Sequence, residues 1–329
     1  MSTGLADTPT SAVDEINSIA EVTNDQWAIE TDAIKAALTE YFGADLAGSE
    51  MVPPNDPAEL RARLRAAAPQ LTGLTDHVRE LFAGGACGIL YSKLGLAQLD
   101  VDDQRKVIYA LSALLGDVVW THPVDNRVVW DVRNQEMTGS PGPKHSSFSE
   151  NDREAEYHTD ASYSSFPDRY FLLYSTRAAE CGGGETFLTD GRVLKRELER
   201  TEEGRAAVQV LSKTRLPMRV PKAFRKGATV DEAGYSHDLI LGESPMWKFR
   251  KDKIENGLAK FPEHATPEVR SALDVLYREM DGHADEFCAA IPTDAVLIVD
   301  NHLALHGRTG FTDSRRHLLR ARFHAAPAS

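Results

Sequence analysis

The residues with the clearest chemical potential are His158 and Asp160, in the stretch Glu156-Tyr-His-Thr-Asp160. Side chains alternate along a β-strand, so this spacing predicts an imidazole and a carboxylate on the same face of a strand. Together the two groups can bind one metal ion. The pair alone is a weak signal, because His-x-Asp arises by chance in many chains and also occurs as a polar pair at a strand end.

A second group of polar residues lies far downstream, in Asp300-Asn-His-Leu-Ala-Leu-His-Gly-Arg308. A histidine from another strand would complete a set of two histidines and one carboxylate, which leaves three positions open on a non-haem Fe(II). Both His302 and His306 are candidates, because on a strand they share a face. Their spacing also matches two zinc ligands on a helix, but no Glu follows His302 and a strand-like run precedes it at 295–299. A zinc hydrolase is therefore not favoured.

Four motifs in this order resemble the Fe(II)/2-oxoglutarate-dependent oxygenases, in the branch that contains taurine dioxygenase and clavaminate synthase. They are His-x-Asp at 158–160, Gly-Gly-Glu-Thr at 183–186, Asp-Asn-x-x-x-x-His-Gly-Arg at 300–308 and Arg-x-Leu-x-Arg at 316–320. The segment from about residue 75 also fits the general layout of this family. The resemblance selects His306 over His302, so the metal ligands that it implies are His158, Asp160 and His306.

The same resemblance implies residues that bind 2-oxoglutarate. Thr186 matches the threonine that contacts the cosubstrate, and Arg316 matches the arginine that binds its distal carboxylate, for which a planar guanidinium is well suited. The spacing from the distal histidine varies in the family, so Arg320 is the alternative for this role. If Arg316 holds 2-oxoglutarate, Arg320 lies four residues further along the same strand face, about 13 Å away at ~3.3 Å per residue. It would then contact an anionic group of the substrate.

The implied function is a dioxygenase that uses Fe(II), 2-oxoglutarate and O2 to hydroxylate an unactivated C–H bond, with release of succinate and CO2. The expected substrate is a small, amino-acid-like metabolite that carries a carboxylate or is zwitterionic. Asp160 favours hydroxylation over halogenation, because related halogenases have a small residue in place of the carboxylate. Desaturation, epoxidation and cyclisation stay open. So do a cupin-type metal protein that does not use 2-oxoglutarate and a non-catalytic jelly-roll binding module.

The expected fold is of the α+β class, with a double-stranded β-helix (a cupin-like jelly roll), flanking helices and a helical insertion at about 189–286. Residues 1–24 are polar and are expected to form a flexible tail, and 25–74 a helical lead-in packed on the core. Residues 75–329 would form the oxygenase domain. The stretch 134–156 has no periodicity and leads directly to His158, so we expect it to act as a lid.

Apolar periodicity predicts the main elements of this fold. The expected helices are Asn24–Phe42, Asp56–Ala68, Val101–Leu115 and Thr266–Glu286, and the clearest strands are Tyr170–Thr176, Ala295–Val299 and the strand that carries Arg316 to Arg322.

Composition limits the possible partners. The chain has 329 residues, 42% of them hydrophobic, which is enough for one large core. Its formal net charge of −13 argues against nucleic acid or an anionic membrane as a partner. Cys87, Cys181 and Cys288 lie far apart and predict neither a disulfide framework nor a zinc ribbon. With no signal-like or membrane-spanning run, the expected location is the cytoplasm, and the expected partner is a small molecule. The sequence does not indicate an oligomeric state.

Overall fold

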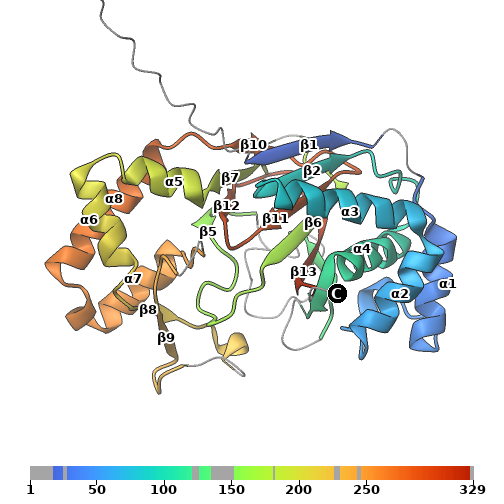
Figure 1. Cartoon of the computed structure of the whole chain (residues 1–329), viewed down its shortest axis with the longest axis horizontal. Helices are drawn as coiled ribbons and strands as arrows, with labels where there is room; N and C mark the ends of the chain where they lie inside the picture. The colour runs from blue at the N-terminus through green and yellow to red at the C-terminus, as the bar shows by residue number, and fades with distance from the viewer. Residues whose placement is uncertain are drawn as a thin grey trace, which may run out of the picture.

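A large sheet forms the centre of the molecule (Figure 1), which we describe from a computed structural model. The structure describes residues 18–24, 28–120, 126–134, 152–180, 182–225, 230–242 and 246–326. Within these residues the large sheet has seven strands. Six follow the order β1 (Ile19–Thr23), β2 (Gly88–Ser92), β11 (Val296–Asp300), β6 (Tyr170–Arg177), β13 (His317–Ala325) and β3 (Gly116–Val119), and β4 (Trp130–Val132) also pairs with β13. Only the pairing of β1 with β2 is parallel within this described sheet.

A smaller antiparallel sheet packs against one face of the large one. Its strands follow the order β10 (Phe287–Ala289), β7 (Thr186–Asp190), β12 (Ala304–Arg308) and β5 (Ala155–His158). Leu188 and Ala304 of the small sheet share one apolar cluster with Phe171, Leu297 and Leu318 of the large sheet. The candidate site residues therefore lie on, or directly beside the ends of, strands that face each other across a packed core.

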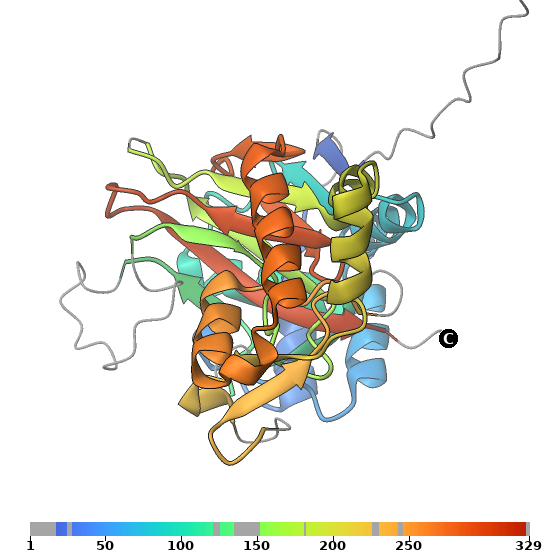
Figure 2. The same cartoon turned by 90° about the vertical axis from the view of Figure 1, so that its left-hand side faces the viewer.

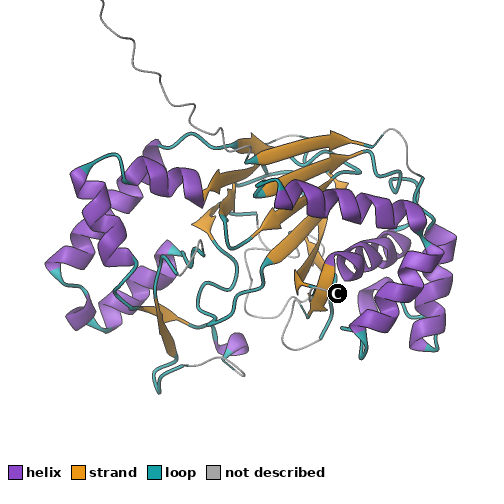
Figure 3. Cartoon of the chain, in the orientation of Figure 1, coloured by secondary structure: helices purple, strands orange, loops and turns teal. Residues whose placement is uncertain are grey.

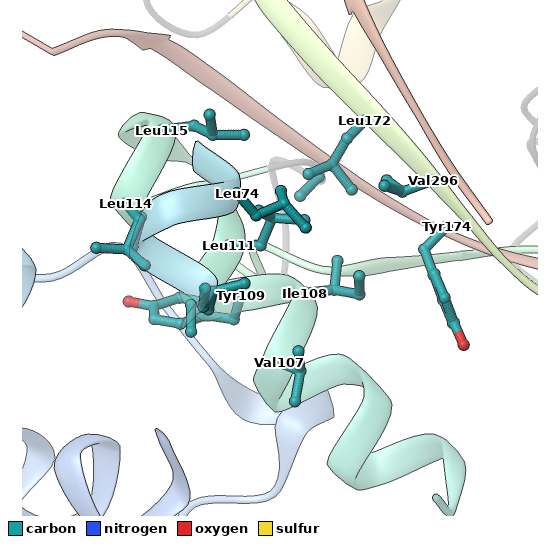
Figure 4. Packing of buried hydrophobic residues seen from close by; sticks show 14 of the residues in the cluster. Leu74, Val107, Ile108, Tyr109, Leu111, Leu114, Leu115, Leu172, Tyr174 and Val296 are labelled. Atoms are coloured by element: carbon teal, nitrogen blue, oxygen red, sulfur yellow. The ribbon is translucent and has the colours of Figure 1, made fainter. Parts of the chain in front are cut away.

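The large sheet is buried on both faces, which explains the uninterrupted apolar runs of its central strands. Along β6, Phe171 points to the small sheet, whereas Leu172 and Tyr174 belong to a second cluster on the opposite face. On that opposite face, α3 (Pro69–Ala83) and α4 (Val101–Leu115) pack on the strands, and α1 (Thr31–Phe42) and α2 (Pro57–Ala67) pack against α4 (Figure 3). Figure 4 shows Ile108 and Leu111 of α4 on the side that faces Leu172, Tyr174 and Val296.

A second group of helices covers the outer face of the small sheet, in front of its strands in Figure 2. It consists of α5 (Gly191–Leu198), α6 (Glu202–Leu211), α7 (Lys251–Lys260) and α8 (Pro267–Gly282), with the hairpin of β8 (Leu216–Arg219) and β9 (Tyr235–Asp238). Its apolar cluster reaches Leu305 of β12. Short 3-10 turns lie at Gly48–Glu50 (η1), Lys222–Phe224 (η4) and Pro262–His264 (η5).

Most of the expected elements are present, but their ends differ from the predictions. Helix α4 has the predicted bounds, because Asp100 caps its first turn and Gly116 follows its last residue. The first predicted helix begins later, at Thr31. The expectation of an unstructured tail to residue 24 is wrong for Ile19–Thr23, which form β1. That strand is stabilised by pairing with β2, about 70 residues away, which local composition does not reveal.

The predicted lid, 134–156, lies mostly outside the described residues, and its last residues form the start of β5. In the part of the chain that the structure describes, no helix is long and apolar enough to cross a bilayer. Cys87 is buried and Cys288 exposed, and both are free.

Close packing between the strands of the small sheet predicts a strong effect of a single methyl group. In Gly307→Ala, the new Cβ would overlap the Phe187 ring and lie 2.5 Å from the carbonyl oxygen of Ala155. We expect the free energy of unfolding in urea to fall by about 1–3 kcal/mol. Gly73→Ala is the control, because Gly73 is exposed within α3 and its Cβ meets nothing within 4 Å. That change should stabilise the protein by roughly 0.5–1 kcal/mol. Equal effects of the two substitutions would contradict the packing described here.

Candidate metal centre

Three potential metal ligands meet at the facing ends of β5 and β12. His158 and His306 are directly opposite each other in the antiparallel register, and their ring centroids are 4.4 Å apart. Asp160 lies next to them, with 3.8 Å between its Oδ1 and Nε2 of His158. One ligand atom from each of the three residues lies within 4.8 Å of the others. The structure thus brings together the three residues that the sequence motifs selected.

The path of the chain to these ligands differs from the simple alternation that the sequence suggested. Strand β5 ends at His158, so Asp160 lies in the turn that follows and not on the strand. In addition, Arg308 is opposite Ala155 while His306 is opposite His158, so β5 has one extra residue between these pairs. This bulge lets Ala155 and His158 face the same cavity although they are three residues apart.

Asn301 fixes the position of Asp160. The Asp160 N–H donates to Oδ1 of Asn301 at 2.7 Å, and the amide nitrogen of Asn301 donates to the carbonyl oxygens of Asp160 and Asp168. The preceding residue, Thr159, is held by hydrogen bonds to the backbone of Phe249. In the sequence, Asn301 stands only as part of the motif at 300–308, which assigns it no role. Its fixed place beside Asp300 in that motif was the available signal.

The imidazole nitrogens have the partners expected of metal ligands. Nδ1 of His158 is 2.8 Å from the carbonyl oxygen of Glu156, which leaves Nε2 toward the other ligands. His306 likewise interacts with the backbone of Ala304, two residues earlier in the chain. An imidazole held by a backbone carbonyl through one nitrogen can bind a metal through the other.

The electrostatic state of the three groups also suits a cation. Burial, together with the neighbouring His306, lowers the pKa of His158 to about 3, and burial lowers the pKa of His306 to about 4. Burial alone would raise the pKa of Asp160. The positive charges of Arg320 and the two histidines lower it by more, so the pKa of this carboxyl lies well below its usual range. At neutral pH the site therefore offers two neutral imidazoles and one carboxylate, the donor set of non-haem Fe(II) centres with open positions.

A cavity of about 80 Å³ lies beside these ligands and contains every predicted site residue. Its lining includes Thr186 of β7, Arg316 immediately before β13, and Arg320 of β13. Leu318 lies between the two arginines on the same strand face, as the strand period predicts. Arg322 is not in the lining and pairs instead with Asp168 at 2.9 Å.

Arg316 is a buried cation without a counterion in the part of the chain that the structure describes. It is 4% exposed, its Nη1 has no hydrogen-bond partner, and no carboxylate among the described residues forms an ion pair with it. Burial, with a smaller effect of Arg308, lowers the pKa of Arg316 to about 9. Burying an unpaired charge is costly, so this guanidinium is suited to bind an anion.

Arg320 already has an acidic neighbour. Its Nη1 lies 3.6 Å from Oδ2 of Asp160, and burial lowers its pKa despite this carboxylate. Its Nε is buried and has no hydrogen-bond partner among the described residues, so the guanidinium retains capacity for a further acceptor.

A larger cavity, of about 370 Å³, lies behind β5 and shares no lining residue with the first. Four carboxylates contribute to its lining, from Glu154, Glu156, Asp281 and Asp285. None of the three potential metal ligands reaches it, and we therefore place the chemistry in the smaller cavity.

The ligand set predicts the outcome of three substitutions. His158→Ala, Asp160→Ala and His306→Ala should each reduce Fe(II) or Co(II) binding at least ten- to a hundredfold, because a three-ligand site loses affinity and geometry with one ligand. Equilibrium dialysis under anaerobic conditions measures the change. His302→Ala is the matched control, because His302 lies in the turn before β12 and contacts the carbonyl oxygen of Pro167. Normal metal binding in any of the three variants would remove that residue from the ligand set.

Comparison with solved structures places the architecture among known proteins. An asparagine oxygenase in complex with Fe(II), 3-hydroxyasparagine and succinate has a TM-score of 0.63 and 18% identity, with 93% of each chain covered. The non-haem iron oxygenase OrfP, bound to Fe and alpha-ketoglutaric acid, has a TM-score of 0.60 and 18% identity, with 93% of this chain and 94% of that chain covered. OrfP bound to Fe, succinate and (3S)-hydroxy-L-Arg gives 0.61 and 17%, with 93% of each chain covered. At these identities the likeness shows the fold alone.

Comparison of the sequence with protein families is more specific. A search of curated proteins finds no match. Residues 53–322, however, match the taurine catabolism dioxygenase TauD, TfdA family, in agreement with the resemblance of the sequence motifs. This match covers most of the chain and includes all three potential metal ligands. The chain belongs to the TauD, TfdA family of dioxygenases.

Proposed function

We propose that the chain is an Fe(II)- and 2-oxoglutarate-dependent dioxygenase that hydroxylates an unactivated C–H bond of a small, amino-acid-like metabolite. The observation that carries this proposal is the meeting of two opposite kinds of site in one cavity. His158, Asp160 and His306 form a cation site, and the buried Arg316 forms an anion site. A 2-oxo acid with a distal carboxylate can occupy both, because its keto-acid end chelates a metal and its other end is an anion.

Each residue has a separate role in this proposal. His158, Asp160 and His306 hold Fe(II), Arg316 binds the distal carboxylate of 2-oxoglutarate, and Thr186 lies beside it in the lining of the cavity. When bound, Fe(II), 2-oxoglutarate and O2 supply the oxidising power that converts C–H to C–OH, with succinate and CO2 as products. The protein binds and orients the reactants and excludes water, since Phe171, Leu173 and Leu318 line the same cavity.

Asp160 bears on the type of reaction. Its carboxylate occupies a ligand position that a halogenating enzyme would leave open for halide, so we propose hydroxylation. Desaturation, epoxidation and cyclisation use the same oxidant and are the alternatives. A metal protein that does not use 2-oxoglutarate would have no need of the buried Arg316, which therefore favours the cosubstrate.

The substrate class rests on Arg320 and on the neighbouring structures. We propose a substrate with a carboxylate, because the cavity contains a second guanidinium with a buried Nε that has no partner. Hydroxylated amino acids, 3-hydroxyasparagine and (3S)-hydroxy-L-Arg, are bound in the similar oxygenase structures. An amino acid or amino-acid-derived metabolite fits both observations.

The family and the two facing sheets also suggest the wider architecture. We infer that the two facing sheets form a double-stranded β-helix, with 75–329 as the oxygenase domain, 189–286 as its helical insertion and 25–74 as the helical lead-in. We also propose a reducing, cytoplasmic location, in which Cys87 and Cys288 would remain free thiols. The proposed partner is a small molecule.

The role of Arg316 is tested by cosubstrate binding. Anaerobic addition of 2-oxoglutarate to the Fe(II) protein should produce a visible charge-transfer band. In Arg316→Met, the titration should require about a hundred- to several-thousandfold more 2-oxoglutarate, because loss of one partner of a buried charged pair costs about 3–5 kcal/mol. Arg315→Met is the matched control, because Arg315 is more exposed and pairs with Asp313 and Glu180. If Arg320→Met shows the defect and Arg316→Met does not, the two roles are reversed.

The role of Arg320 is tested by substrate kinetics. A screen of amino acids for succinate release coupled to substrate oxidation identifies the substrate. With that substrate, Arg320→Met should raise KM at least tenfold while the charge-transfer band with 2-oxoglutarate is retained. A neutral substrate, or an unchanged KM, would contradict the proposed contact with a carboxylate.

A further inference from the structure

A third arginine of the cavity, Arg308, has no role in the proposed function. It is the last residue of β12, two positions after His306, and only 8% of it is exposed. Like Arg316, it lines the cavity beside the metal ligands. Its side chain is held in place, since its Nη2 donates a hydrogen bond to the carbonyl oxygen of Arg153.

Arg308 and Arg316 share one aromatic ring. The guanidinium carbon of Arg308 lies 4.9 Å from the ring centroid of Phe311, and that of Arg316 lies 5.0 Å from the same centroid. Cations at this distance from an aromatic ring are attracted to its face. The ring attracts both guanidiniums and so offsets part of the repulsion between them, which helps to fix where each one lies.

Phe311 is itself fixed by two other segments. Its N–H donates to the carbonyl oxygen of Asp152 at 2.9 Å, and Asp152 lies just before β5, which carries His158. Phe311 also forms a β-bridge with Gly183, in the turn that leads to Thr186. These contacts fix the backbone of Phe311, and the residue is only 4% exposed, so its ring has little room to move.

The stem of Arg316 is confined as well. A Cβ placed on Gly184 would lie 3.1 Å from both Cδ and Nε of Arg316, so the turn backbone packs directly against this side chain. The guanidinium of Arg316 therefore has the Gly184 turn near its stem and the Phe311 ring beside its head. Its Nη1 is buried and has no hydrogen-bond partner among the described residues, so the guanidinium can still donate to a ligand.

We propose that Arg308 is a positioning residue for the cosubstrate, which acts through Phe311 to hold the Arg316 guanidinium in the orientation that receives a distal carboxylate. The inference rests on the proposed binding of 2-oxoglutarate by Arg316. In this arrangement Arg308 makes no direct contact with the carboxylate. Its effect on affinity therefore depends on Arg316 being present.

The test is a comparison of two 2-oxo acids of equal chain length in the full-length Fe(II) protein, without O2. 2-Oxoglutarate has the distal carboxylate, and 2-oxopentanoate lacks it. Kd for each is measured from the charge-transfer band in the unmodified protein, Arg308→Met, Arg316→Met and the double variant. We expect Arg308→Met to raise Kd for 2-oxoglutarate about tenfold and to leave Kd for 2-oxopentanoate and the affinity for Fe(II) unchanged. In the Arg316→Met background, Arg308→Met should have no further effect.

Two further variants keep the test independent of folding defects. Phe311→Leu removes the ring and should produce the same selective loss as Arg308→Met. Arg308→Lys keeps a cation near the ring and should give a smaller loss, and it replaces the Met variant if that protein does not fold.

Each remaining outcome contradicts a different statement. Equal losses for both 2-oxo acids would show a general packing role for Arg308. If the losses of 2-oxoglutarate affinity caused by Arg308→Met and Arg316→Met are fully additive in the double variant, Arg308 contacts the carboxylate itself. If Arg316→Met weakens 2-oxoglutarate and Arg308→Met does not, the inference fails while the proposed function stands. If Arg316→Met leaves Kd for 2-oxoglutarate unchanged, both this inference and the proposed cosubstrate site at Arg316 are wrong.

Discussion

The antiparallel register between β5 and β12 is the constraint on which the candidate site depends. It places His158 opposite His306, so that two imidazoles from distant parts of the chain face one cavity. A shift of one residue would turn one of them to the opposite face of the sheet, toward the α5–α8 helices. The register is kept by the packing around Gly307, where a side chain would collide with both neighbouring strands.

The charges around this cavity explain why it is a binding site and not merely a polar region of the core. Arg308, Arg316 and Arg320 supply three guanidiniums to the lining, against the single carboxylate of Asp160. Most buried arginines elsewhere in proteins are paired, because an unpaired buried charge is destabilising. A metal ion neutralises part of the carboxylate, and the arginines then require anions from the reactants. In the proposed function, 2-oxoglutarate and an anionic substrate group supply them.

Much of the site was accessible from the sequence, because the motifs retain the residue types that the chemistry requires. His158, Asp160 and His306 were selected before any geometry was known, and Thr186, Arg316 and Arg320 line the same cavity. The alternation of side chains along a strand did not predict the position of Asp160 correctly. Asp160 lies beyond the end of its strand, and its position comes from Asn301, about 140 residues away. The bulge in β5 is also a product of pairing with β12 and leaves no mark in local sequence.

The same distinction applies to the fold. Helix α4 was predicted residue for residue, because capping, periodicity and a terminal glycine are all local. Strand β1 was missed, since its stability comes from β2 and not from its own composition. The support of Arg316 by Phe311 and Arg308 was missed for a related reason. Contacts between a ring and two guanidiniums depend on three segments meeting, and no spacing in the sequence encodes that meeting.

The most direct test of the central claim is the position of the metal itself. Crystals grown anaerobically with Fe(II) and 2-oxoglutarate allow the ion to be located by its anomalous scattering. The account predicts one strong peak at bonding distance, about 2.0–2.2 Å, from His158, Asp160 and His306, with the distal carboxylate of 2-oxoglutarate against Arg316. A metal peak among the carboxylates of the larger cavity, with none between the two histidines, would contradict it.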